Sequence, residues 1–247
     1  MTIRIVLADD HRLMRDGVKA LLRREPGFEL VGEAHDGLEA LRLARELQPD
    51  VLVTDLAMPG MNGIEAIRRV RTEVPAVQVL CLSVHDEDRM VLAGIDAGAA
   101  GYVLKDSSFE ELAQAIRKVV ARQIYLSPGL VGLFVEGYRT RGAAKAEPPG
   151  GGGAYSQLTP REREIVQLFS EGHSTSQIAE QLHLSAKTVA THRENVLRKL
   201  RIESIAELTR YAIREGLSSL EAPCRGGSGA AEPEAGKPAK RARAVAH

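Results

Sequence analysis

Five polar residues in the first half of the chain could together carry out chemistry on a phosphoryl group. They are the carboxylates of Asp9, Asp10 and Asp55, the hydroxyl of Ser83 and the ammonium of Lys105. Each follows a short apolar run, often β-branched, which is typical of a strand buried on both faces. Because the carboxyl ends of parallel strands lie along one edge of a sheet, we expect these side chains to converge.

Such a cluster favours attack by a carboxylate with the help of a metal ion. Close, unpaired carboxylates repel one another, and a hard divalent cation such as Mg²⁺ relieves the repulsion. Asp55 could then attack phosphorus as a nucleophile, while Lys105 and Ser83 bind the phosphoryl oxygens. Any one of these acids alone is equally well explained as a solvated loop residue. Their joint position at strand ends favours a site.

The elements that position these residues alternate along the chain. Strands are expected at 3–7, 28–34, 51–54, 77–82 and 102–104. Helices fill the intervals, and the first of them has apolar residues at helical spacing, namely Leu13, Met14, Val18, Leu21 and Leu22. Right-handed crossovers between strands then predict an α/β fold, a doubly wound five-stranded parallel sheet of flavodoxin-like type.

Composition divides the remaining chain. Residues 1–125 carry 16 basic and 20 acidic side chains, a net charge of −4, and the rest carry 17 and 13, a net charge of +4. We expect a first domain at 1–124, a linker at 125–156 with a short helix and a flexible Gly/Pro/Ala stretch, a helical domain at 157–217, and a disordered tail at 218–247. Domains joined in this way are expected to move independently.

No membrane span or signal peptide is expected, because no apolar run approaches eighteen residues and the chain enters a strand at once. Two cysteines without metal-like spacing suggest no disulfide framework. Both features favour a protein that works in the cytoplasm, away from membranes.

Residues 157–217 show no strand pattern and four short helical segments, which predicts an all-α domain. Capping boxes mark helix starts at Thr159, Ser174 and Ser204. A short helix at 175–183, a turn and a longer helix at 186–200 describe a helix-turn-helix, which places its second helix in the major groove of double-stranded DNA.

The longer helix has a packed side and a polar side. With Val189 facing inward, Val196, Leu197 and Leu200 fall on the same side. The polar side supplies the donors and small side chains that a DNA-reading surface needs, and its residues are Lys187, Thr188, Ala190, Thr191, Glu194, Asn195 and Arg198, with His192 at the edge. A merely solvated face is the alternative, and the net charge of only +1 over residues 155–217 favours it. The helix-turn-helix spacing outweighs the charge and favours a DNA-reading surface.

The first domain resembles the receiver domain of two-component response regulators. The resemblance is carried by ADDH at 8–11, TDLAMPGMNG at 54–63, LSVH at 82–85 and YVLKD at 102–106. It implies that Asp55 is the phosphoacceptor and that Mg²⁺ is bound by Asp9, Asp10, Asp55 and the Ala57 carbonyl. By the same resemblance Lys105 is the phosphate partner, Ser83 the hydroxyl switch and Tyr102 the aromatic switch.

The second domain resembles the LuxR-type DNA-binding domain, through LTPRERE at 158–164, Ile178-Ala179 and LSAKTVATHRENVLRKL at 184–200. Together the two resemblances indicate the NarL/FixJ family. They imply a transcription regulator, not an enzyme, that accepts a phosphoryl group from a sensor histidine kinase. They also imply a homodimer on DNA, formed through an exposed apolar stripe of the helix at 205–214. Ala190 and Glu194 depart from many relatives on the DNA-reading side.

Two other functions remain open from the sequence. One is a regulator whose receiver is never phosphorylated and serves only as a dimerisation platform. The other is a magnesium-dependent, phosphatase-like enzyme that works through an aspartyl-phosphate. Enzymes of the second kind carry another acid two residues after the nucleophile, where this chain has Ala57.

Overall fold

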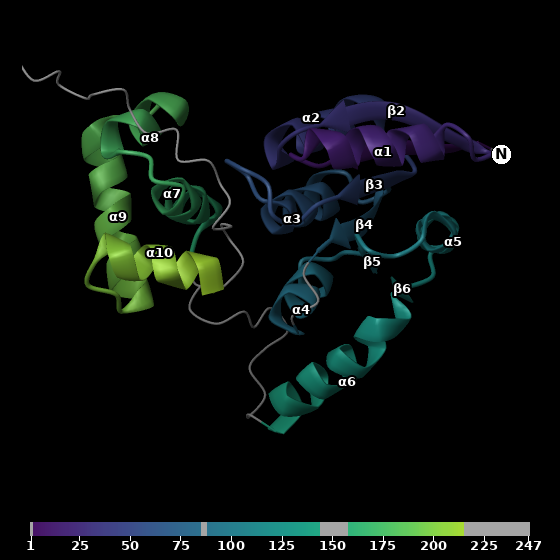
Figure 1. The fold of residues 1–247 in the computed structure, drawn as a ribbon. Coiled ribbons are helices and arrows are strands. Elements are labelled where there is room, and N and C mark those ends of the chain that lie inside the picture. Colours follow the sequence, from purple (N-terminus) through teal and green to yellow (C-terminus); the bar gives the residue numbers. More distant parts are fainter. Residues whose placement is uncertain (1, 85–87, 144–157, 215–247) are drawn as a thin grey trace, which may run out of the picture.

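The computed structural model describes residues 2–84, 88–143 and 158–214 (Figure 1). Six strands are present in this part of the chain: β1 (Ile3–Ala8), β2 (Phe28–Ala34), β3 (Val51–Thr54), β4 (Gln78–Ser83), β5 (Gly101–Leu104) and β6 (Tyr125–Leu126). Five helices accompany the strands: α1 (Arg12–Leu22), α2 (Gly37–Leu47), α3 (Gly63–Glu73), α4 (Asp88–Asp96) and α5 (Phe109–Val120). Five more follow: α6 (Pro128–Ala143), α7 (Pro160–Ser170), α8 (Thr175–Gln181), α9 (Ala186–Leu200) and α10 (Ile205–Arg214).

The strands form one parallel sheet in the order β2-β1-β3-β4-β5-β6. The doubly wound α/β prediction is therefore confirmed, with one difference in strand number. The added edge strand, β6, pairs Gly101 with Tyr125 and Tyr102 with Leu126. Two residues are too few to produce an alternating pattern, which is why sequence analysis placed this segment in the linker.

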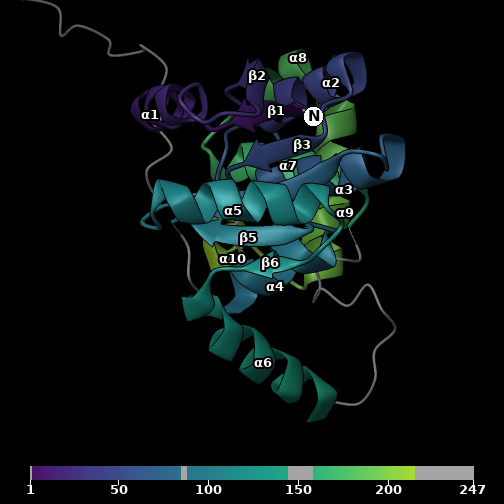
Figure 2. The same ribbon diagram turned by 90° about the vertical axis from the view of Figure 1, so that its right-hand side faces the viewer.

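Two apolar layers cover the sheet, one on each face (Figure 2). Helices α1 and α5 bury Val18, Leu22 and Ile116 against one face. Helices α2, α3 and α4 contribute to the layer on the other face, which includes Leu41 and Ile67. Burial on both faces explains why the central strands read as continuous apolar runs. The polar residues that follow these strands therefore lie at one edge of the sheet, close to one another.

The helical domain has a core of its own, to which α7, α8, α9 and α10 all contribute. Complete capping boxes begin α7 at Thr159 and α8 at Ser174, as predicted. Helix α9 has the predicted bounds, and α8 ends two residues before the predicted end. The Gly/Pro/Ala stretch of the linker, from residue 144 onward, and the tail at 218–247 lie outside the described residues. The domain boundaries placed there stay predictions.

The two domains lie against each other, with α7 facing α3 and the loop between β3 and α3 (Figure 1). The linker composition predicts domains that move independently, and the structure instead shows a contact between them. The contact is made by Arg, Glu and Gln side chains of α3 and α7. Because these side chains are polar, their pattern in the sequence predicts a helix face exposed to solvent.

Gly63 is a sensitive position in the turn that leads from Asp55 into α3. A Cβ there would overlap the Asp55 carbonyl oxygen and lie 2.8 Å from the Leu56 Cα, so the backbone itself would have to move. We expect Gly63→Ala to lower the free energy of unfolding by about 3 kcal/mol. Urea unfolding followed by circular dichroism measures this.

The matched control is Gly17→Ala in α1, where an added Cβ meets nothing within 4 Å. It should stabilise the protein by about 0.5–1 kcal/mol, because alanine loses less backbone entropy in a helix. Equal effects of the two substitutions would contradict the tight approach at Gly63.

Candidate metal centre and nucleic-acid interface

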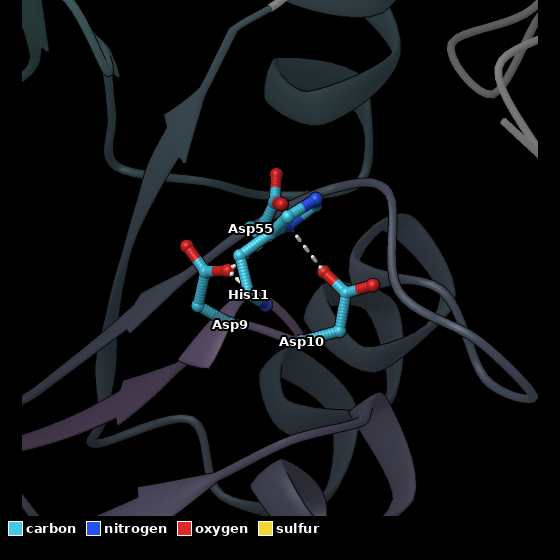
Figure 3. Close-up of side chains that lie close together, drawn as sticks. All are labelled: Asp9, Asp10, His11 and Asp55. Atoms are coloured by element: carbon cyan, nitrogen blue, oxygen red, sulfur yellow. Dashed lines mark hydrogen bonds and ion pairs between the residues drawn. The ribbon is translucent and has the colours of Figure 1, made fainter. Parts of the chain in front are cut away.

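Three carboxylates gather at the carboxyl ends of β1 and β3 (Figure 3). Asp9, Asp10, His11 and Asp55 each present one potential ligand atom, and these atoms all lie within 4.8 Å of one another. Asp9 and Asp55 are buried, whereas Asp10 and His11 are exposed. A cluster of hard oxygen donors that is closed on one side and open to solvent on the other suits a divalent cation.

Lys105 joins this cluster from the end of β5. Its Nζ lies 2.8 Å from Asp9 Oδ2 and 2.6 Å from Asp55 Oδ2, and its side chain is only 5% exposed. The N–H of Lys105 donates to the Ser83 carbonyl at 2.9 Å, which ties the loop after β5 to the end of β4. The structure thus brings Asp9, Asp55 and Lys105 into direct contact.

The pKa values of Asp55 and Lys105 are both raised, and within each group burial and the neighbouring charges act in opposite directions. Burial raises the pKa of Asp55 above its ordinary value, although the attraction of Lys105 opposes the rise. Burial also acts to lower the pKa of Lys105, but its ion pairs with Asp55 and Asp9 raise it overall. The two upward shifts are compatible. Two carboxylates stabilise the charged form of Lys105, whereas Asp55 has to share this single cation with Asp9.

The Asp55 carboxylate is oriented by the backbone that follows it. Oδ1 accepts a hydrogen bond from the Leu56 N–H at 2.7 Å, while Oδ2 faces Lys105. Ala57, whose carbonyl is the expected fourth metal ligand, lies half-buried in the same loop. These contacts leave Oδ2 on the side of the ammonium, where a second anion would be stabilised.

Ser83 and Tyr102, the two expected switch residues, are both fully buried. Ser83 ends β4, and Tyr102 lies on the neighbouring strand β5, whose register pairs it with Cys81. A Cβ added at Gly94 would lie 3.3 Å from Cys81 Sγ and 3.6 Å from the Tyr102 ring, so this ring packs beneath α4. Their switching roles stay predictions.

Sequence analysis did not include His11 in the cluster. Its Nδ1 lies 2.8 Å from Asp10 Oδ1 and 3.4 Å from Asp9 Oδ1 (Figure 3). The adjacency of His11 to the two acids in the sequence is the signal that could have identified it. A half-exposed imidazole there adds a nitrogen donor, or a positive charge when protonated, at the open side of the site.

The polar side of α9 is open. Val189, Val196 and Leu200 are buried in the domain core, as predicted. The residues predicted to face DNA are exposed at Lys187, Thr191, Glu194 and Arg198 and partly exposed at Thr188, Ala190, His192 and Asn195. Helix α9 lies on the side of its domain that points away from the receiver (Figure 1). A DNA duplex could therefore approach it without meeting the first domain.

The predicted apolar stripe on α10 is not exposed in the described residues. Leu208, Tyr211 and Ala212 are buried and belong to the core that α7 shares. The expectation of a seam formed by an exposed stripe is therefore wrong for these residues. The small domain needs its last helix to close its own core, so the apolar side points inward.

These features define a class of protein. A doubly wound domain with a carboxylate cluster and a buried lysine at one sheet edge is joined to a helix-turn-helix domain with an open second helix. The family model for the response regulator receiver domain matches residues 5–117, and the model for bacterial regulatory proteins of the luxR family matches residues 156–212.

The chain belongs to the response regulators of the NarL/FixJ family, and it is a two-component transcription regulator with a LuxR-type DNA-binding domain. It is 35% identical to the response regulator protein VraR of Staphylococcus aureus over 217 residues, which cover 88% of this chain and 99% of VraR. No helix in the described part of the chain combines the length and apolar character needed to cross a membrane.

Solved structures agree with this assignment. A LuxR-family two-component response regulator from Aurantimonas sp. SI85-9A1 has a TM-score of 0.54 at 41% identity, covering 57% of this chain and 99% of that one. The RcsB response regulator of Salmonella typhimurium has a TM-score of 0.51 at 25% identity, covering 85% of this chain and 97% of that one.

The raised pKa of Asp55 predicts a pH dependence of stability. An acid whose pKa is raised on folding binds its proton more tightly in the folded state, so stability rises as the pH falls from the raised pKa toward the ordinary value of 3.8. In chelator-containing buffer, Asp55→Asn should be more stable than wild type at pH 7. This difference in stability should shrink as the pH falls from the raised pKa toward 3.8. Thermal unfolding across pH measures it.

The control is Asp16→Asn on the exposed surface of α1, where only a 3.7 Å pair with Arg12 is lost. This variant should follow wild type at every pH. A loss of stability in Asp55→Asn at pH 7 would contradict the assigned direction.

Proposed function

We propose that the receiver is phosphorylated on Asp55 by a sensor histidine kinase and that phosphorylation controls DNA binding by α9. The observation that carries this proposal is the contact of one buried ammonium, Lys105, with two buried carboxylates beside an open metal-ligand cluster. A site built only as a structural ion pair would not need the additional acid and imidazole at its open side.

The donor set fits Mg²⁺, which prefers oxygen ligands and keeps part of its water shell. Asp9, Asp10, Asp55 and the Ala57 carbonyl would hold it, and when bound it would neutralise charge on the transferring phosphoryl group. Asp55 Oδ2 forms the bond to phosphorus as the bond from phosphorus to the donor breaks, and the leaving group keeps that electron pair. Lys105 remains charged and moves its contact to a phosphoryl oxygen.

Phosphorylation of Asp55 would change the positions of neighbouring residues. A phosphoryl group adds negative charge and strong acceptor oxygens at Asp55. Ser83 would donate its hydroxyl hydrogen bond to one of these oxygens, and Tyr102 would adjust to the space that Ser83 leaves. Since Ser83 and Lys105 lie on adjacent strand ends, the β4 and β5 loops would move together.

The test of the acceptor is intact mass after incubation with Mg²⁺ and acetyl phosphate. Wild type should gain one phosphoryl group, and Asp55→Asn should gain none because its amide is not a nucleophile. Asp10→Asn should retain a reduced rate, since the nucleophile remains and one metal-ligand charge is lost. A phosphoryl group on Asp55→Asn would refute the assignment, and none on folded wild type would favour the unphosphorylated platform.

DNA binding is proposed for the open side of α9, where Lys187 and Arg198 supply positive charge at the two ends. The domain has low net charge, so one copy would bind weakly and two copies on adjacent half-sites would be required. We propose a homodimer on DNA. Sedimentation of the protein–DNA complex at the mass of one protein chain per duplex would refute it.

Arg198→Ala should weaken binding to a duplex selected from a random-sequence pool by the phosphorylated protein. Loss of one phosphate-neutralising charge should also reduce the slope of log affinity against log salt by about one. The control is Arg12→Ala, which removes the same charge from an exposed position on α1. Equal effects of the two variants would indicate a general charge effect and contradict a DNA surface on α9.

A further inference from the structure

One side chain of the DNA-binding domain holds the loop that follows Asp55. The Gln167 Nε2 on α7 donates to the Met58 carbonyl at 2.8 Å, and the Gln167 Oε1 accepts from the Asn62 N–H at 3.0 Å. Gln167 is 2% exposed, and Met58 and Asn62 are equally enclosed. A single amide therefore satisfies one backbone acceptor and one backbone donor at the two ends of the five-residue segment 58–62.

Glu171, the C-cap residue that follows α7, supports the middle of this segment. Glu171 Oε1 accepts from the Gly60 N–H at 3.1 Å and from Gln167 Nε2 at 2.8 Å. Gly60 has a φ of +73°, a left-handed conformation that glycine adopts without strain. The loop thus has three backbone groups bonded to side chains of the other domain, and without that domain these groups would lose those hydrogen bonds.

Ion pairs fix the position of α7 against α3. Arg163 Nη1 lies 3.1 Å from Glu65 Oε2, and Arg69 Nη2 lies 2.5 Å from Glu164 Oε1. The Glu65 side chain is 5% exposed, so its charge is screened little by solvent. The α7 members of these pairs lie one helical turn before Gln167, so the pairs help to hold its amide against the loop.

The loop matters to the reaction because it begins three residues after Asp55 and directly follows Ala57, the expected carbonyl ligand. We propose that Gln167 is a positioning residue for phosphorylation of Asp55. By holding Met58 and Asn62, it keeps the Ala57 carbonyl preorganised for the metal ion. The DNA-binding domain thereby contributes to the reaction of the receiver. This inference rests on the proposed function of Asp55.

An amide is the chemistry that this position requires. Glutamate could accept from the Asn62 N–H but could not donate to the Met58 carbonyl, and it would place a second charge beside Glu171. Methionine has nearly the same length and volume as glutamine but neither bonds the carbonyl nor accepts strongly from the N–H. Gln167→Met therefore removes the two hydrogen bonds to the loop, together with the one to Glu171, while retaining the packing of the side chain.

The experiment measures the affinity of the full chain for Mg²⁺ by calorimetry and, by intact mass, the rate of its phosphorylation by acetyl phosphate as a function of Mg²⁺ concentration. Gln167→Met should weaken Mg²⁺ binding and raise the Mg²⁺ concentration for half-maximal rate by about three- to tenfold, as expected when the hydrogen bonds that preorganise the loop are lost. The rate at saturating Mg²⁺ should recover to that of wild type. Gln114→Met, on the exposed face of α5, is the matched control and should match wild type.

Arg163→Ala provides an independent variant, because it removes an interdomain ion pair and leaves Gln167 intact. It should shift the Mg²⁺ dependence in the same direction, and it tests the proposal if Gln167→Met fails to fold. Wild-type Mg²⁺ dependence in the folded variants would overturn the inference. So would a loss of rate that saturating Mg²⁺ does not restore. Absence of phosphorylation in wild type itself would instead overturn the proposed function.

Discussion

Two carboxylates buried beside a single ammonium are the constraint on which the rest of this structure depends. Asp9 and Asp55 have too little room for solvent to screen their repulsion, and Lys105 neutralises only part of their charge. The sheet makes the arrangement possible, because parallel strands deliver their polar ends to one edge. The excess negative charge is a cost to the fold, and it would also favour the binding of a divalent cation, which in turn would offset the charge of a phosphoryl group.

The loop at the same edge is also where the two domains are in contact. The loop after Asp55 is bonded to α7 through backbone groups, so its conformation and the position of the DNA-binding domain are parts of one equilibrium. A change in charge at Asp55 would change the conformation of that loop. Displacement of α7 would change it as well, because the hydrogen bonds to Gln167 would break. Coupling of this kind is reciprocal by thermodynamic necessity. Helix α9 lies on the side of its domain away from the receiver, so its polar side stays accessible while the contact exists.

Much of this could be predicted from the sequence, because local rules agree with the fold. Apolar runs ending in polar residues identified the strands and the cluster, and capping boxes located helix starts such as Thr159. Apolar periodicity was less reliable at the surface: Leu13 has helical spacing but is 88% exposed. The role of Gln167 could not be predicted, since a polar residue on a helix reads as solvated until the partner domain is placed against it. The two-residue strand β6 was too short to produce a pattern.

Calorimetry of Mg²⁺ binding to Lys105→Met and to wild type at pH 8 shows whether Lys105 and the metal ion compete for the same carboxylates. If Lys105 balances charge that a metal ion would otherwise balance, its removal leaves Asp9 and Asp55 with more uncompensated charge. The account predicts tighter Mg²⁺ binding by the variant than by wild type. Equal or weaker binding by a folded variant would contradict it, because the ammonium would then be supporting the metal site and not competing for its ligands.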